Sequence, residues 1–208
     1  TKSRNPGLRA DVWGDDKPRK LAAESAWKKP FTWNRRAQRN GNPETVFCLS
    51  LGDILEDHKD VAEARKRLIE TVIPETPWLR WLLLSKRPQN ATRLLGRDVI
   101  NLDNVWLGTT CGVKRTGLER VRRLLRIETP RSFVSMEPLI ERVSLRGYID
   151  DLQWVISGGE SRQRAGQQPR WTEMRWIEAL VEECDDAGVP HFVKQLGSWP
   201  LLDGNRFE

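Results

Sequence analysis

Six charged side chains of this chain could take part in acid–base chemistry or bind a charged substrate, because each follows a short apolar run. Three are acids and three are cations: Asp53, Glu137, Glu160, Lys86, Arg87 and Lys194. A carboxylate can serve as a general acid or base, and a lysine or arginine suits a phosphate or carboxylate on a substrate. Hydroxyl, glycine and amide positions follow the same runs: Ser50, Thr109, Thr110, Gly158, Gly159, Ser161 and Gln195.

The apolar runs predict the strands that position these side chains. They lie near 45–50, 80–85, 104–109, 131–136, 153–157 and 191–195. Runs of this length without polar alternation are typical of strands buried on both faces of a parallel sheet. Since ligands bind at the carboxyl ends of such strands, we expect one cavity to collect the side chains that follow them. These are Ser50, Asp53, Lys86, Arg87, Thr110, Glu137, Glu160, Lys194 and Gln195.

Amphipathic segments separate several of the strands. The apolar positions in 60–72, 117–127 and 172–187 recur at helical spacing, and Gly188 with Pro190 indicates a helix end. Connections of this length require parallel neighbours joined by right-handed crossovers. Pro138 and Gly147 indicate that 140–153 forms an irregular connection in place of a full helix.

The length of 208 residues predicts a single α/β domain over 1–208, an open or partial parallel α/β barrel with about six strands. The βα repeats occupy 44–200. Residues 1–43 are expected to form an irregular basic segment with at most one short helix near Leu21 to Trp27, since Pro and Gly recur there. No apolar stretch suits a membrane span, so we expect a soluble, cytoplasmic protein with no membrane partner.

Charge and cysteine usage constrain the partners. The net charge is +6, with much of the excess before residue 40, which favours approach to a polyanion but is equally typical of a solvated face. The three cysteines, Cys48, Cys111 and Cys184, are far apart in sequence. This spacing favours buried small hydrophobic residues over a disulfide framework or a contiguous metal site, although Cys111 closes a strand.

Several segments together resemble a known family. They include Ser85-Lys86-Arg87-Pro88, Asn104-Val105-Trp106-Leu107-Gly108-Thr109-Thr110, Ser135-Met136-Glu137-Pro138, Gly158-Gly159-Glu160-Ser161 and Pro190-His191-Phe192-Val193-Lys194-Gln195. Over nearly all of its length, the chain is similar to a phage and prophage family with a three-cysteine motif. That family in turn resembles radical S-adenosylmethionine (radical SAM) enzymes.

The resemblance implies a cofactor pair. Family members carry three N-terminal cysteines that would hold a [4Fe–4S] cluster, whose open iron binds the methionyl part of SAM. Cys48, Cys111 and Cys184 do not match these ligands, so we expect the cluster segment to precede Thr1 in a longer protein. A variant without a cluster is the alternative.

The resemblance also implies roles by strand order. Ser50 and Asp53 would accept the methionyl ammonium, Thr109 and Thr110 would meet the ribose, and Gly158 and Gly159 would let the backbone approach SAM, with Glu160 and Ser161 beside them. Lys86, Arg87, Glu137, Lys194 and Gln195 would act on the substrate. The two glycines suit a tight turn equally well, and the cations could simply pair with the acids.

Three function classes remain open at this point. The first is a radical SAM enzyme that modifies a nucleotide or nucleic-acid base. The second is a cluster-independent hydrolase or lyase that uses Glu137 or Glu160 with Lys86 or Lys194. The third is a noncatalytic nucleic-acid-binding module based on the basic N-terminal residues and on Arg115, Arg120, Arg122 and Arg123.

Overall fold

The computed structural model describes residues 17–48, 52–162, 166 and 168–207. Contacts between residues divide the chain into two compact units. The first comprises 1–83 and 90–105, and the second comprises 84–89 and 106–208.

A six-stranded sheet in the order β1-β2-β3-β4-β5-β7 forms an open parallel α/β barrel, which confirms the predicted fold class. The strands are β1 Glu44–Cys48, β2 Leu79–Ser85, β3 Val105–Thr110, β4 Ser132–Met136, β5 Trp154–Gly158 and β7 His191–Gln195. Every predicted strand agrees with its observed bounds to within two residues. The agreement arises because apolar runs of five or six residues have few alternatives to a buried parallel strand.

The first unit contains a long helix that the sequence analysis missed. Helix α1 runs from Glu24 to Asn40, so the prediction of an irregular segment with a short helix near 21–27 is wrong. Pro30 removes one backbone donor, but the helix continues, and the Pro30 and Ala37 side chains are buried on the same side of it. Gly41, with φ of 66°, ends the helix in the left-handed conformation.

The rest of the first unit consists of short helices around β1 and β2. Helix α2 spans Lys59–Arg67 and continues into a π-helical stretch, η2, at Leu68–Val72, which matches the helix predicted over 60–72. After β2 come a 3-10 turn at Pro88–Asn90 and the helices α3 Ala91–Leu95 and α4 Arg97–Ile100.

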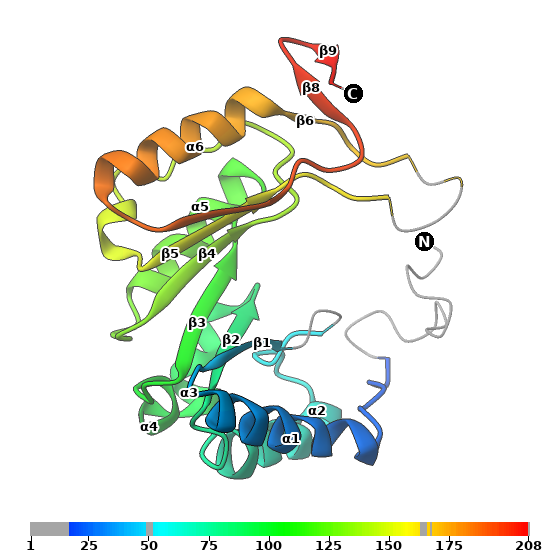
Figure 1. The fold of residues 1–208 in the computed structure, drawn as a ribbon, viewed down its shortest axis with the longest axis vertical. Coiled ribbons are helices and arrows are strands. Elements are labelled where there is room, and N and C mark those ends of the chain that lie inside the picture. The colour runs from blue at the N-terminus through cyan, green and yellow to red at the C-terminus, as the bar shows by residue number, and fades with distance from the viewer. Residues whose placement is uncertain (1–16, 49–51, 163–165, 167, 208) are drawn as a thin grey trace. The chain divides into compact units, whose positions relative to one another are not determined.

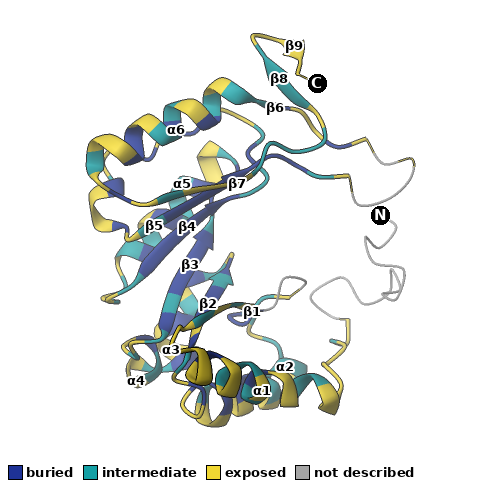
Figure 2. Ribbon diagram, viewed as in Figure 1, coloured by how far each residue is buried: buried dark blue, intermediate teal, exposed yellow. Residues whose placement is uncertain are grey.

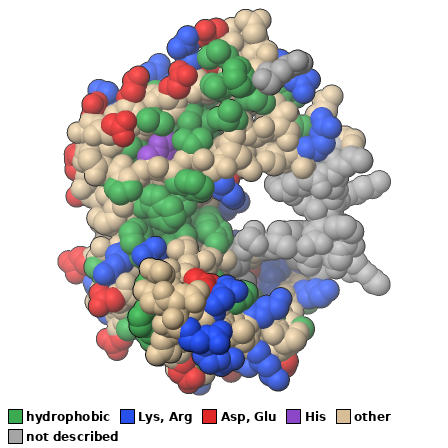
Figure 3. All heavy atoms as spheres, in the orientation of Figure 1, with side chains coloured by type: hydrophobic (Ala, Val, Ile, Leu, Met, Phe, Trp, Pro, Cys, Tyr) green, Lys and Arg blue, Asp and Glu red, His purple; other side chains and the backbone are tan. Residues whose placement is uncertain are grey.

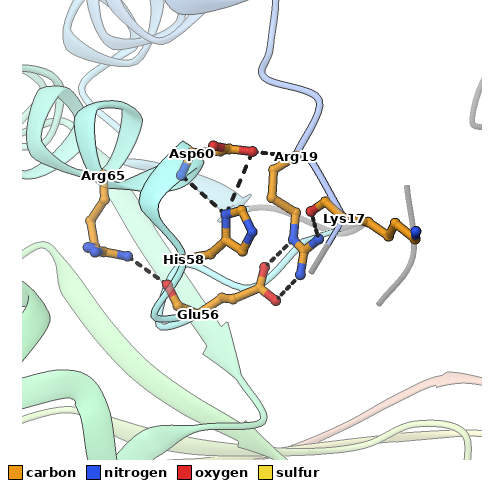
Figure 4. Close-up of polar contacts among 6 residues, drawn as sticks. All are labelled: Lys17, Arg19, Glu56, His58, Asp60 and Arg65. Carbon is orange, nitrogen blue, oxygen red and sulfur yellow. Dashed lines mark hydrogen bonds and ion pairs between the residues drawn. The ribbon is translucent and has the colours of Figure 1, made fainter. Parts of the chain in front are cut away.

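A polar network connects the N-terminal segment to the start of α2 (Figure 4). The Arg19 guanidinium donates to both oxygens of Glu56, at 2.8 and 2.9 Å, and the Arg19 backbone N–H donates to the Asp60 carboxylate at 3.0 Å. The Glu56 carbonyl in turn accepts from Arg65 at 2.9 Å, while His58 Nδ1 accepts the Asp60 N–H and caps the helix. The histidine at this loop position therefore has a structural role.

In the second unit, helices α5 Lys114–Leu125 and α6 Met174–Ala187 pack against β4 and β5 (Figure 1). Both helices were predicted. The connection after β4 is irregular, as predicted, apart from a 3-10 turn at Ile149–Asp151. Figure 2 shows β4 and β5 as buried, and their core contacts include Val134, Met136 and Val155 against Val121 of α5 and Leu180 of α6.

A small second sheet was not predicted. It contains β6 Thr172–Glu173, β8 Pro200–Leu202 and β9 Asn205–Arg206, in the order β6-β8-β9. Strands of two or three residues are too short for a periodic pattern, which explains the omission. Among the helices of the described residues, none has the length and apolar composition needed to cross a membrane.

Candidate active site

The second unit has a sheet face turned away from its helices, which we call the open face. Val134 and Val155 contact the helices, so the alternate residues of β4 and β5 lie on the opposite side. Strand pairing places Gly108, Phe133 and Trp154 in one row of this face. The next row toward the carboxyl ends contains Thr110, Ser135, Ile156 and Phe192.

The open face is aromatic at the first of these rows. The Trp154 ring centroid lies 6.1 Å from both the Phe133 and Trp106 centroids, and the second pair is edge-to-face. Gly108 is required here, since an added Cβ would come within 2.3 Å of the Phe133 ring. Phe192, in the next row, leaves 51% of its surface exposed and provides a free apolar wall.

Beyond the rows, a charged pair marks the carboxyl ends of the strands. Lys194 Nζ lies 3.2 Å from Glu137 Oε2, with 53% of the lysine side chain and 16% of the glutamate side chain exposed. The register of β5 and β7 shifts between Ser157 and Gly158, which is a bulge. Bulges re-aim side chains, and this one accompanies the approach of Lys194 to Glu137. The pair presents a cation and an anion together at the edge of the sheet.

Gly158, at the end of β5, and Gly159, which follows it, make room for this chain's own backbone. A Cβ on Gly158 would lie 3.1 Å from both the Gln195 carbonyl and Glu137 Oε1, and one on Gly159 would lie 2.2 Å from the Leu196 carbonyl. The Gln195 amide also donates to the Gly159 carbonyl at 3.0 Å. The space that a glycine leaves for a ligand is therefore filled by β7 and the residues after it, and the turn interpretation fits better than the SAM-binding one.

Glu160 is held by an arginine that the sequence analysis did not single out. Arg170 Nε and Nη2 donate to the two Glu160 oxygens at 3.0 and 2.9 Å, and the Arg170 backbone N–H adds a third bond at 2.8 Å. The Glu160 side chain is only 9% exposed. The hydrogen bonds that Arg170 donates to Glu160 raise the pKa of the Arg170 guanidinium. Glu160 thus fixes the chain that leads into the small sheet, and its carboxylate is engaged.

The remaining predicted residues of the second unit fall into two groups. Thr109 is buried and donates its hydroxyl to the Ser85 carbonyl at 2.8 Å, which links two strands. Thr110 is half-buried on the open face, and Ser161 is also half-buried. Lys86 and Arg87 follow β2, where the Arg87 N–H donates to the Ser85 hydroxyl at 2.8 Å.

The predicted residues of the first unit are Ser50 and Asp53. Ser50 lies outside the described residues. The Asp53 carboxylate accepts the Leu55 N–H at 3.0 Å, as in a turn. The convergence of Asp53 with the residues of the second unit stays a prediction.

Two residues of this region were missed, for different reasons. Phe192 belongs to an apolar run that was interpreted as buried on both faces, whereas β7 is exposed at three of its five positions. β7 is the last strand in the order of the sheet, and a strand at the edge of a sheet is expected to leave some of its side chains exposed. No sequence pattern indicates that Arg170 pairs with Glu160, because the two residues are ten positions apart across an irregular connection.

The described residues do not fit an iron–sulfur cluster. All three cysteines are buried, and burial raises the pKa of Cys48 and Cys111 to about 12 and that of Cys184 to about 11. Cluster ligands are closely spaced thiolates. Among the described residues, no three His, Cys, Asp or Glu side chains form a group suited to a metal ion. An iron–sulfur cluster would therefore need ligands other than the described cysteines.

A hollow of about 480 Å³ in the second unit is lined by the start of α5, the connection after β4 and α6. Its wall includes Lys114, Arg142 and Arg146, with Glu182 and Glu183 beside them. The Glu183 carboxylate accepts the Leu145 N–H at 2.8 Å and lies 3.8 Å from Arg146. The two acids offset two of the three cations, and Arg146 also lies 3.8 Å from Asp186, so the hollow offers little net charge to an anionic ligand.

Comparison with known proteins identifies the family. A family described as "Protein of unknown function (DUF5131)" matches residues 2–206. The chain belongs to the DUF5131 family. No curated protein and no solved structure matches the chain. Because the DUF5131 match spans both compact units, the open face and the charged pair both lie within the shared family region.

Proposed function

We propose that this chain is the barrel of a radical-SAM-type enzyme that modifies a nucleotide or a nucleic-acid base. The observation that carries the proposal is the open face of the second unit, which changes from an aromatic row to a charged pair at the carboxyl edge of a parallel sheet. That edge is where open parallel sheets and α/β barrels bind their ligands. The family resemblance of the strand-end motifs supports the same assignment.

The open face is complementary to the parts of SAM. The methionyl part of SAM carries one ammonium and one carboxylate. In the Glu137–Lys194 pair, Glu137 would accept from the ammonium and Lys194 would donate to the carboxylate. Phe192, which pairs with the buried Ile156, provides an apolar surface for an adenine ring. Thr110, in the same row, provides a hydroxyl for the ribose. When bound, SAM supplies a reactive sulfonium.

The residue roles in this proposal differ from those that the family resemblance implies. Lys194 and Glu137 move from substrate chemistry to SAM binding. Gly158, Gly159 and Glu160 move from SAM binding to the support of the edge, since the chain itself occupies their contacts. Gln195 belongs with this support through its bond to Gly159. No step of the proposal is assigned to a cluster held by the described residues.

Equilibrium dialysis with labelled SAM tests the binding half of the proposal. We expect Glu137→Gln and Lys194→Gln to weaken SAM binding by roughly tenfold to a hundredfold, the range for one charged hydrogen bond. Arg175→Gln is the matched control, because it breaks an exposed ion pair with Asp203 in another part of the unit. Unchanged binding in both site variants, or no binding of SAM, overturns this half.

Formation of 5′-deoxyadenosine tests the radical half. The complete protein, purified without oxygen, reconstituted with iron and sulfide and then reduced, should release this product from SAM. SAM binding without 5′-deoxyadenosine, in the presence and absence of nucleotides, would leave a SAM-binding enzyme and refute the radical assignment.

A second candidate function is cluster-independent acid–base catalysis, which the 3.2 Å contact of Lys194 with Glu137 favours. A carboxylate beside an ammonium is a suitable proton-transfer pair for a hydrolase or lyase. The engagement of Glu160 by Arg170 leaves Glu137 as the acid for this alternative. Catalysis that persists without SAM and disappears in Glu137→Gln would favour it.

A further inference from the structure

Helix α1 carries a cluster of cations on its exposed side, which we call the basic face. Its members are all exposed: Lys28, Lys29, Arg35, Arg36 and Arg39. At 3.6 residues per turn, Lys28, Arg35 and Arg39 fall on one line along the helix, about 16 Å long at the rise of 1.5 Å per residue. Lys29 and Arg36 lie about a quarter of a turn away. Figure 3 shows Lys and Arg side chains gathered over α1.

Most of this positive charge is not offset within the described part of the chain. Arg36 pairs with Glu44. Arg35 donates to the Thr32 hydroxyl at 3.3 Å, which leaves its charge intact. Lys28, Lys29, Arg35 and Arg39 form no ion pair with any described residue, in contrast to Arg122 and Arg123 of α5, which share Glu119. Lys28 is attracted by the Glu24 carboxylate, which already pairs with Arg67, and Lys29, Arg35 and Arg39 have no ion-pair partner among the described residues, so the basic face presents a net positive charge to solvent.

The opposite side of α1 is used for packing. Pro30 and Ala37 are buried, and Asn34 Oδ1 accepts the Trp78 N–H at 2.8 Å. Arg67 lies 4.7 Å above the Trp27 ring. A helix that inserts into a membrane surface must keep its apolar side available for lipid, and α1 uses this side within its own unit. These contacts also hold the helix in place, so its cations form a pre-organised line.

We propose that the basic face of α1 binds the phosphate backbone of a polynucleotide. A straight line of Lys and Arg side chains, without an aromatic platform between them, suits phosphates and provides no base recognition. Binding to a polynucleotide does not depend on the proposed function. That the bound polynucleotide is the substrate of the enzyme rests on the proposed function. The binding is expected to be independent of base sequence and strongly dependent on salt.

Fluorescence anisotropy with labelled single-stranded and duplex DNA and RNA of mixed sequence tests the proposal. The test variant is Lys28→Gln/Arg35→Gln/Arg39→Gln. At low salt we expect it to bind roughly tenfold or more weakly, and we expect the slope of log K against log salt to fall by about 3, one unit for each lost phosphate contact. The loss should be similar for every oligonucleotide sequence.

A matched variant on α5, Arg120→Gln/Arg122→Gln/Arg123→Gln, removes the same charge and should bind within about twofold of the original protein. An equal loss in both variants, or no loss in the α1 variant, overturns the proposal. Tighter binding to phosphatidylserine vesicles than to nucleic acid also overturns it. SAM dialysis separates the two proposals. For the α1 variant we expect normal SAM binding together with weakened nucleic-acid binding. An original protein that binds SAM but no nucleic acid would refute only this inference.

Discussion

At the scale of single residues, the hydrogen bonds of Glu160 show how one buried acid organises a connection. Its carboxylate receives three N–H groups from Arg170, which positions the chain before the small sheet. We predict that Glu160→Gln lowers the free energy of unfolding by about 2 kcal/mol, since hydrogen bonds to a charged and largely buried group are lost. Urea denaturation measures the change. Arg175→Gln, which breaks an exposed pair, should leave stability nearly unchanged, and an equal loss there would contradict the argument.

His191 predicts a pH dependence. Burial lowers the pKa of His191 below its usual value of 6.5, with Asp185 acting in the opposite direction. Nε2 lies 2.9 Å from the Ser157 hydroxyl, while Nδ1 is buried without a hydrogen-bond partner among the described residues. A protonated ring would place a donor there with no acceptor. The fold therefore favours the neutral ring.

Because the pKa of His191 is lowered in the folded protein, the free energy of unfolding should fall as the pH falls. The stabilisation from neutral His191 is fully present above pH 6.5 and is lost as the pH falls toward the folded-state pKa, because the unfolded chain binds the proton first. Urea denaturation between about pH 8 and about pH 5 should show this loss in the original protein. His191→Gln should show a smaller loss over the same range, and parallel curves for the two proteins would contradict the prediction.

At the scale of elements, the end of α1 depends on Gly41. Its N–H donates to the Gln38 carbonyl at 3.1 Å, and its φ of 66° is a conformation that L residues adopt at a cost. We predict that Gly41→Ala lowers the free energy of unfolding by about 1 kcal/mol and that Gly41→Asn, which tolerates this conformation better, costs less. Thermal unfolding checks the order. Equal stability of the Ala variant and the original would show that α1 ends differently.

At the scale of the whole molecule, one strand belongs to both compact units. Leu79–Leu83 of β2 lie in the first unit, and Leu84 and Ser85 lie in the second. A shared strand couples the unfolding of the two units, so we predict a single cooperative transition, as expected of one domain. Tryptophan fluorescence and far-ultraviolet circular dichroism should give coincident urea curves. Two separated transitions would instead indicate two independently folding domains.

The sequence by itself determined the open parallel α/β barrel. Apolar runs such as Leu82 to Leu84 are typical of strands buried on both faces of such a sheet, and the amphipathic spacers between them indicate parallel neighbours. The positions of Glu137, Thr110 and Lys194 at the strand ends followed from the same reasoning. The length of α1 did not, because a local rule about Pro30 was outweighed by packing of the helix on its unit.

Only the tertiary structure decided which of these side chains are available for chemistry. Lys194 meets Glu137 across 57 residues, and Arg170 engages Glu160 through a connection that has no periodic pattern. Gly158 and Gly159 admit the strand beside them, which no local signal distinguishes from admitting a ligand. Strand direction and periodicity are local properties of a sequence. The partner of a charge depends on distances between segments far apart in the chain, and those distances exist only in the folded protein.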